Sequence, residues 1–281
     1  MKLTRKDFLT HGALASAALA LTGKTAAAAE PAPTPAAKPP PGPPPPSAIH
    51  FPVLKPGEYD EKKMWAVLKT KKPHKLVWES VGAHLIVPGL SSLYIHIQNA
   101  LNADEISFGW GRQNVASAAV LLFPSLIFAF NDAMWSKYKF GESYKMLDAS
   151  GKPETANVYY KAQTSMSWDG DAGAGGNIYQ DWSGEACVKR GCTFMVCHNA
   201  LAALGAFTAM ATGMEPGAVI ADLKANMLPG FIIVPAGVGA LHAAMDNGWK
   251  MLPIILCRFP RSSRRSPSAS RWVSWAGAGR S

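Results

Sequence analysis

Apolar residues follow two different rhythms along the chain from about residue 58 onward. Five short, continuous apolar runs predict buried β-strands, because strands covered on both faces carry apolar side chains at nearly every position. Between these runs, apolar residues recur every three or four positions, as on one face of an α-helix. Strands that alternate with helices predict an α/β fold with a single doubly wound, mostly parallel five-stranded sheet and helices on both faces. The predicted strands cover residues 75–79, 115–123, 193–197, 231–235 and 250–256.

Helical spacing predicts the elements that connect these strands. One helix is expected to open at Pro124, since proline suits a first turn, and to continue through Trp135. The polar, Gly-rich segment 141–176 is interpreted as an insertion. The remaining predicted helices cover residues 60–68, 90–101, 178–189, 199–210, 218–226 and 238–247.

The first 29 residues have the order of a signal peptide: a short basic region, a weakly apolar stretch and then small residues. The apolar stretch, at residues 8–21, is too short to cross the roughly 30 Å of a bilayer as a helix. Residues 4–9 resemble the twin-arginine motif with Lys6 in place of the second arginine, which leaves the general secretory route open. We expect cleavage after Ala29, export to the periplasm with the twin-arginine route favoured, and no stable membrane span after cleavage.

Two further segments flank the predicted domain, which covers residues 58–257. Residues 30–57 are rich in proline and alanine and predict an extended linker, because such a run has few donors and little apolar mass. Residues 258–281 form a basic, Arg- and Ser-rich tail of low complexity. The tail is either a docking segment for an acidic surface or anionic lipid, a disordered end, or a frame-shifted end of the coding sequence; we favour the last two interpretations.

The formal charge of +9 is concentrated at the two ends of the chain. Residues 1–29 carry four basic side chains and one acidic one, and residues 258–281 carry six arginines and no acid. Residues 30–257 hold 18 basic and 18 acidic side chains and are therefore neutral. Because a neutral body presents no broad basic face to phosphates, we expect no nucleic-acid partner for the folded domain.

Four cysteines, three of them within eleven residues, raise the question of metal or redox chemistry. The spacing of the three neighbouring cysteines, Cys187, Cys192 and Cys197, fits the ligand patterns of zinc and iron–sulfur sites poorly. We therefore expect no metal and no cofactor. Cys192 and Cys197 fall at the two ends of one predicted strand, roughly 16 Å apart and beyond disulfide reach. Cys187 and Cys192 straddle a turn at Gly191 and are candidates for a disulfide, although free thiols are favoured; Cys257 is expected to be free.

Cys197 is the candidate nucleophile or persulfide carrier. It ends the third apolar run and immediately precedes a predicted helix. A thiol at this position meets the positive end of the helix dipole and free N–H groups, both of which favour the nucleophilic thiolate. His198 is a candidate to assist, although neighbouring strand residues point to opposite faces. The alternative is that Cys197 is a small buried apolar residue, and this pattern leaves the two open.

Other polar motifs are weaker. Residues 167–176 contain an Asp-x-Asp pair and a Gly-rich run, but they lack the later ligands of a calcium loop and the preceding strand of a dinucleotide site. We expect a flexible surface loop there, placed to act as a lid over the Cys197 edge of the sheet. The remaining acidic and histidine candidates form no acid–base pair and are interpreted as surface or satisfied polar groups: Asp132, Glu142, His84 and His96.

Several short motifs resemble the DsrE family of sulfur-relay proteins. Residues 193–201 (TFMVCHNAL) resemble the strand–Cys–helix segment of that family, and residues 231–238 (FIIVPAGV) followed by Asn247-Gly248-Trp249 resemble its C-terminal signature. Residues 96–102 and 135–138 fit an exported subgroup. The resemblance covers residues 73–256. It implies a doubly wound α/β domain, assembly into homotrimers or homohexamers, and a cysteine at position 197 that carries a persulfide in the catalytic members.

The chain departs from the compact family pattern in its export signal and in the insertion at 141–176. Our first hypothesis is an exported DsrE-like protein that handles sulfur or thiols through Cys197, with a sulfur-relay or redox partner. The alternative is a non-catalytic binding or assembly module of the same fold in the periplasm. A redox enzyme subunit is a third hypothesis, which no cofactor motif supports. Whether the protein is an enzyme stays open.

Overall fold

The computed structural model describes residues 51–82 and 85–254, all of which belong to one compact unit within residues 41–281. Several predictions fall on residues outside these ranges. They are the signal peptide at residues 1–29, most of the 30–57 linker, His84, Cys257 and the basic tail at 258–281.

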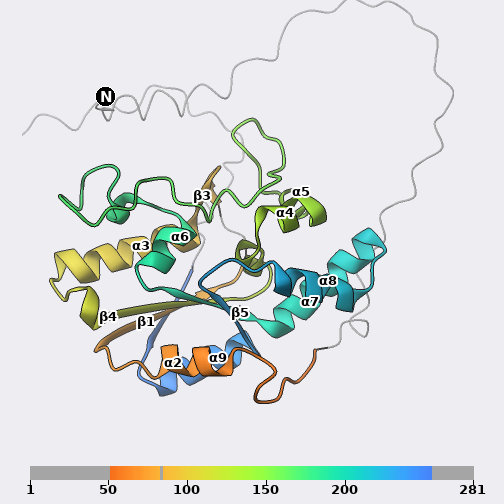
Figure 1. Ribbon diagram of the computed structural model, residues 1–281, viewed down its shortest axis with the longest axis horizontal. Helices are drawn as coiled ribbons and strands as arrows, with labels where there is room; N and C mark the ends of the chain where they lie inside the picture. Colours follow the sequence, from red (N-terminus) through yellow and green to blue (C-terminus); the bar gives the residue numbers. More distant parts are fainter. Residues whose placement is uncertain (1–50, 83–84, 255–281) are drawn as a thin grey trace, which may run out of the picture. The chain divides into compact units, whose positions relative to one another are not determined.

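A five-stranded, all-parallel sheet forms the centre of the domain (Figure 1). Its spatial order is β6-β5-β4-β1-β7, and each neighbouring pair is parallel. Helices flank the sheet, as the alternating apolar runs predict, so the α/β, doubly wound fold class is confirmed. The strands are β1 (His74–Ser80), β4 (Val115–Leu121), β5 (Thr193–Cys197), β6 (Phe231–Val234) and β7 (Lys250–Pro253).

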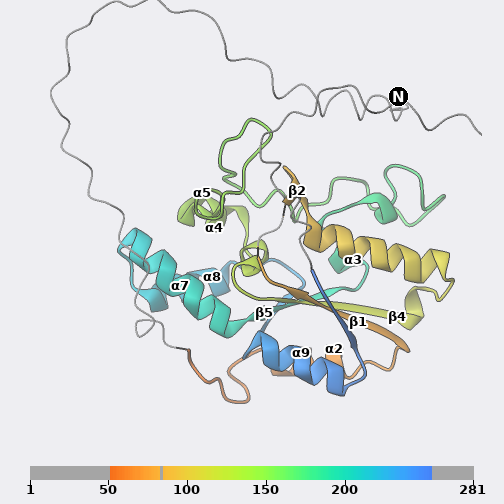
Figure 2. The same cartoon turned by 180° about the vertical axis from the view of Figure 1, so that it is seen from behind.

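Two sets of helices cover the two faces of the sheet (Figures 1 and 2). α2 (Glu61–Leu68) and α9 (Gly237–Asp246) pack on one face. The other face is covered by α3 (Ser92–Asn102), α6 (Gly184–Lys189), α7 (His198–Thr212) and α8 (Pro216–Ala225).

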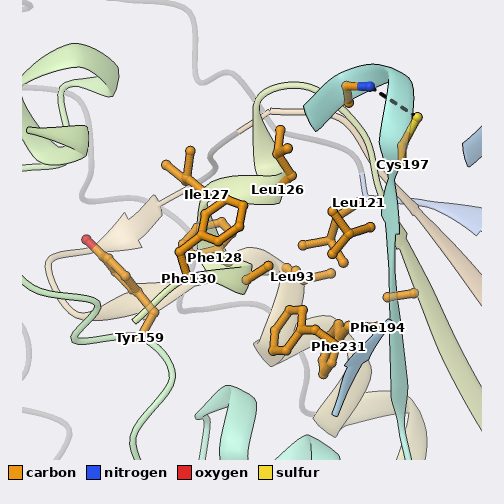
Figure 3. Packing of buried hydrophobic residues seen from close by; sticks show 14 of the residues in the cluster. Leu93, Leu121, Leu126, Ile127, Phe128, Phe130, Tyr159, Phe194, Cys197 and Phe231 are labelled. Carbon is orange, nitrogen blue, oxygen red and sulfur yellow. Dashed lines mark hydrogen bonds between the residues drawn. The ribbon is translucent and has the colours of Figure 1, made fainter. Parts of the chain in front are cut away.

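Side chains alternate between these two faces along each strand. On β5, Phe194 and Val196 enter the larger apolar cluster, whereas Met195 enters the smaller one under α2 and α9. The larger cluster is rich in aromatic side chains, and Figure 3 shows Phe194 and Phe231 stacked within it, with ring centroids 4.8 Å apart. A two-sided core of this kind explains why the inner strands have continuous apolar runs. The edge strand β7 is exposed at all four positions, so the prediction that it is buried is wrong.

The helix predicted to run from Pro124 through Trp135 is interrupted. A 3₁₀ helix (Ser125–Ala129) comes first, and α4 (Asp132–Tyr138) begins anew. The side chain of Asn131 accepts a hydrogen bond from the backbone N–H of Met134 and so caps α4. A third short helix, α5 (Phe140–Tyr144), follows Lys139, whose backbone is left-handed. The apolar spacing of residues 124–135 correctly predicts which side chains are buried, but the cap formed by Asn131 divides the predicted helix.

The helix predicted over residues 178–189 is also divided. A 3₁₀ turn (Ile178–Gln180) precedes α6, and the buried Asp181 lies between them. Its carboxylate accepts hydrogen bonds from the backbone N–H groups of Gln163, Thr164 and Ser183. These bonds tie the insertion to the start of α6, which an uninterrupted helix would not allow.

Some elements were not predicted at all. They are a small hairpin formed by β2 (Leu85–Val87) and β3 (Leu90–Ser91), a π-helix (Ala103–Ser107) that extends α3, and a 3₁₀ turn (Arg112–Asn114) before β4.

The insertion at 141–176 lacks regular structure over most of its length but is anchored in the core. Asn157 donates hydrogen bonds to the carbonyl oxygens of Phe128 and Phe130, and Tyr159 is buried beside them. In its Gly-rich part, Trp168 lies under the guanidinium group of Arg112, 3.9 Å from the ring centroid. Because Arg112 precedes β4, this part lies at the edge opposite Cys197, and the prediction of a lid over Cys197 is wrong.

Asp181→Asn is expected to loosen the insertion. Burial raises the pKa of Asp181, but hydrogen bonds from Ser183, Thr164 and Gln163 outweigh burial and hold this pKa below its ordinary value of 3.8. The carboxylate therefore adds stability above about pH 4, which is lost as pH falls through the lowered pKa. At neutral pH the amide should cost about 2–4 kcal/mol, because the charge of the acceptor is lost and the NH₂ group must face a donor at whichever oxygen it replaces.

Urea unfolding at pH 7 and pH 3 measures this effect, and the difference between wild type and variant should shrink in acid. Asp171→Asn is the control, since Asp171 is exposed and accepts one backbone N–H, from Gly173. Equal stability loss in both variants would contradict the anchoring role of Asp181.

Candidate functional site

Adjacent strands β5 and β6 send their following helices to opposite faces of the sheet. α7 and α8 leave β5 on the face of the larger core, whereas α9 leaves β6 on the other. In open parallel sheets, ligands bind outside the carboxyl ends of two such strands, because the diverging connections leave a crevice. Cys197 is the last residue of β5 and therefore lies at this point.

Cys197 is also the N-cap residue of α7. Its Sγ accepts a hydrogen bond from the backbone N–H of Ala200 at 3.4 Å, as Figure 3 shows. N-cap positions usually carry Ser, Thr, Asp or Asn, whose oxygen atoms are better acceptors than a neutral thiol. A thiolate would serve as the stronger acceptor at this position, and the positive end of the 15-residue helix stabilises its negative charge.

The first turn of α9 packs directly against Cys197. Cys197 pairs in register with Val234 of β6, and α9 begins three residues later at Gly237. A β-carbon on Gly237 would overlap a methyl group of Leu122 and lie 3.1 Å from the Cβ of Cys197. The absence of a side chain at position 237 therefore allows this approach without displacing Leu122. It brings the backbone at the N-terminus of a second helix close to the cysteine.

His198 is buried at the first position of α7, and its Nδ1 has no hydrogen-bond partner among the described residues. Burial and the positive charge of Lys224 lower the pKa of His198, so its imidazole is neutral at pH 7. Within the described part of the chain, no hydrogen bond joins His198 to Cys197. Asn199 follows, with a buried Oδ1 that also lacks a partner. The two predicted site residues are neighbours, but the structure does not couple them directly.

The other two described cysteines have a different environment. Cys187 and Cys192 are buried and free, so the candidate disulfide between them is absent. Burial raises the pKa of the Cys192 thiol to about 12, and burial also raises the pKa of Cys187 well above its ordinary value. Cys197 retains 6% exposure, against 0% for Cys187 and 2% for Cys192.

Two of the remaining polar candidates have local partners. Asp132 accepts a hydrogen bond from the backbone N–H of Asn157, and the ring of His96 meets the edge of Trp78. Glu142 is exposed on α5. Among residues 51–82 and 85–254, no three His, Cys, Asp or Glu side chains are grouped so that they could hold a metal ion.

Comparisons of the chain with models of protein families, with curated proteins and with solved structures find no match. In the described part of the chain, none of the helices has the length and apolar character needed to cross a bilayer.

The sequence pattern correctly places Cys197 at the end of a strand, but it does not reveal the residue that packs against it. Gly237 follows the Pro235-Ala236 pair at the end of an apolar run, which marks a turn but not the close helix approach. The contact depends on Leu122, more than 100 residues away along the chain.

Gly237→Ala is expected to destabilise the protein by about 1–3 kcal/mol, because an added methyl group must displace Leu122 or α9. Gly239→Ala is a matched control on the same helix, where the nearest atom to the added carbon is 3.9 Å away. That substitution should be neutral or stabilising by up to about 1 kcal/mol. Urea unfolding of both variants tests the contact, and equal free energies of unfolding would contradict it.

Proposed function

We propose that the protein is an exported, DsrE-like protein that holds sulfur as a persulfide on Cys197. The observation that carries this proposal is the position of Cys197 between two helix N-termini. Its sulfur caps α7, and the first turn of α9 packs against it. Both helix ends favour negative charge, which a thiolate and a persulfide anion share.

Sulfur transfer at this site would need no external oxidant. The Cys197 thiolate attacks the outer sulfur of a small persulfide, R–S–SH. A sulfur–sulfur bond forms on Cys197 as the donor's sulfur–sulfur bond breaks, and the donor leaves as the thiol R–SH with the proton. The product, Cys197–S–S⁻, keeps the negative charge between the two helix ends. One sulfur atom moves, with no net oxidation or reduction.

The polar atoms beside Cys197 suit a small ligand. His198 Nδ1 and Asn199 Oδ1 are buried without hydrogen-bond partners among the described residues, and such atoms cost free energy unless something binds them. A neutral imidazole can exchange a proton with a departing thiol, so His198 is the residue proposed to assist.

The setting proposed for this chemistry is the periplasm. The order of residues 1–29 supports export, and Lys6 leaves the route between the twin-arginine and general secretory systems open. The sequence motifs around Cys197 and after β6 support the family resemblance, which implies a homotrimer or homohexamer. The sulfur-relay or redox partner is then a second periplasmic protein.

The low exposure of Cys197 favours a second function. With 6% of its surface accessible, Cys197 also fits a non-catalytic binding or assembly module in which the thiol only packs. The two functions differ in whether sulfur loads onto Cys197.

Incubation of the full chain with a low-molecular-weight persulfide, followed by peptide-resolved mass spectrometry, tests the proposal. We expect the peptide with Cys197 to gain the mass of one sulfur atom. Cys197→Ser should abolish this gain, and Cys192→Ser, a matched change at the start of the same strand, should preserve it. The same spectra would report the mature N-terminus.

Absence of loading on Cys197 in a folded wild-type protein would overturn the sulfur function and favour the binding module. Loading on Cys187 or Cys192 instead would contradict the assignment of the site. Circular dichroism of each variant shows that the fold is retained.

A further inference from the structure

The end of the π-helix and the loop that follows it carry three exposed apolar side chains within five residues. Ile106 is 52% exposed, Phe108 60% and Trp110 37%. The loop is nevertheless held in place. The Trp110 ring stacks on His74 with centroids 3.7 Å apart, and Phe108 lies 5.2 Å from Trp110. Apolar groups that are held in place and yet leave much of their surface exposed, close together, indicate a contact with something else.

The base of this loop is anchored by a buried ion pair. Arg190 Nη2 lies 3.2 Å from Glu105 Oε2, and both side chains are almost fully buried. Arg190 also donates hydrogen bonds to the side-chain oxygen atoms of Gln98 and Asn102 on α3. Glu105 is immediately followed by Ile106, so the projecting segment starts from a fixed point.

Lysines line two clefts beside Trp110. Two adjoining clefts, of about 670 and 180 Å³, share Pro73, Lys75 and Gly248, and the smaller one is lined by Trp110. Asp104 is the one acidic residue that lines these two clefts. The basic residues that line them are Lys69, Lys71, Lys72, Lys75 and Lys250.

Two of these lysines are positioned by carbonyl groups. Lys72 Nζ donates to the carbonyl oxygens of Val115 at 2.7 Å and Arg112 at 3.2 Å, and Lys75 Nζ donates to that of Asn247 at 2.5 Å. Carbonyls orient an ammonium group without cancelling its charge. In the described part of the chain, no carboxylate forms an ion pair with any of the five cleft lysines.

All these groups lie at the amino edge of the sheet. β1 begins at His74 and β7 at Lys250, and Arg112 lies just before β4. In Figure 1, α3 and the π-helix lead to the left side, where β1 and β4 begin. Cys197 lies at the carboxyl edge, so the two regions are separated by the length of the strands, roughly 20 Å.

We propose that the amino edge docks on an anionic lipid surface. Phe108, Ile106 and Trp110 enter the interface between head groups and acyl chains, and the cleft lysines bind lipid phosphates. A soluble phosphate would engage the lysines but would leave Phe108 without a role, so the combination favours a membrane surface. The docked domain presents the Cys197 edge away from the bilayer. This surface is independent of the sulfur chemistry proposed for Cys197.

Co-sedimentation of the full chain with vesicles tests the docking. The vesicles contain phosphatidylcholine alone or with phosphatidylglycerol, and binding is expected only with the anionic lipid. Phe108→Asp should weaken binding about tenfold or more, and so should Lys71→Glu combined with Lys250→Glu. Residues 1–29 and 258–281 are the same in every protein compared, so any binding that they add is common to all.

Matched control variants carry the same chemical changes elsewhere. Val238→Asp changes a residue that is 67% exposed on α9, near Cys197, and Lys152→Glu with Lys224→Glu reverses two exposed charges outside the clefts. Each control should bind within about twofold of wild type. Near-UV circular dichroism confirms the fold of each protein.

Three results would overturn the proposal. Wild type could fail to bind anionic vesicles, or all variants could bind equally, which would assign binding to the chain ends. Loss of binding in the lysine variant with full binding by Phe108→Asp would show a site for phosphate or another anion without insertion. Protection of backbone amides 106–112 from hydrogen exchange on anionic vesicles is the independent readout expected for the wild-type protein.

Discussion

The close approach of α9 to the end of β5 is the contact on which the site depends. Parallel pairing sets Val234 beside Cys197, and the chain turns within three residues into α9. Because position 237 carries no β-carbon, the first turn of α9 settles against Cys197 and Leu122. Leu122 packs against both apolar clusters, so the two cores meet where the two helix N-termini converge. A thiol placed there is surrounded by groups that favour negative charge.

Position alone gives the three neighbouring cysteines different surroundings. Cys187 and Cys192 lie inside the larger core, where burial disfavours their thiolates. Cys197 borders the same core, but it belongs to a helix cap whose N–H group it accepts. The proposed reactivity thus follows from the place where β5 ends. Elsewhere in the domain, the buried polar groups Asp181, Arg190 and Asn157 hold the insertion, α6 and α3 in place.

Sequence reasoning recovered the elements that depend on local pattern. All five strands of the sheet and most helices follow from apolar runs and helical spacing, and the position of Cys197 follows from the strand that it ends. The helix through Pro124 was wrong because Asn131 offers a competing cap, and the helix over 178–189 was wrong because Asp181 binds backbone groups of the insertion. In each case a single polar side chain determines where the helix is interrupted, and the spacing of apolar residues does not reveal this.

The rest depends on contacts between residues distant in sequence. From the sequence, Arg190 is simply a basic residue at the end of a predicted helix. In the structure, its hydrogen-bond and ion-pair partners lie on α3 and the π-helix, about 90 positions earlier. The neutral total charge of residues 30–257 concealed the lysines at the amino edge, because the balancing acids lie elsewhere on the surface. The partners of Arg190 and the lysines at the amino edge come together only when the chain is folded and the strands lie side by side.

Native-state alkylation shows whether Cys197 is reactive in the folded protein. The folded chain is treated with iodoacetamide at neutral pH, and modification of each cysteine peptide is followed by mass spectrometry over time. We expect Cys197 to react in the folded protein, whereas Cys187 and Cys192 should react only after unfolding in urea. Modification of Cys197 that also waits for unfolding would contradict the claim that the two helix ends hold a reactive sulfur.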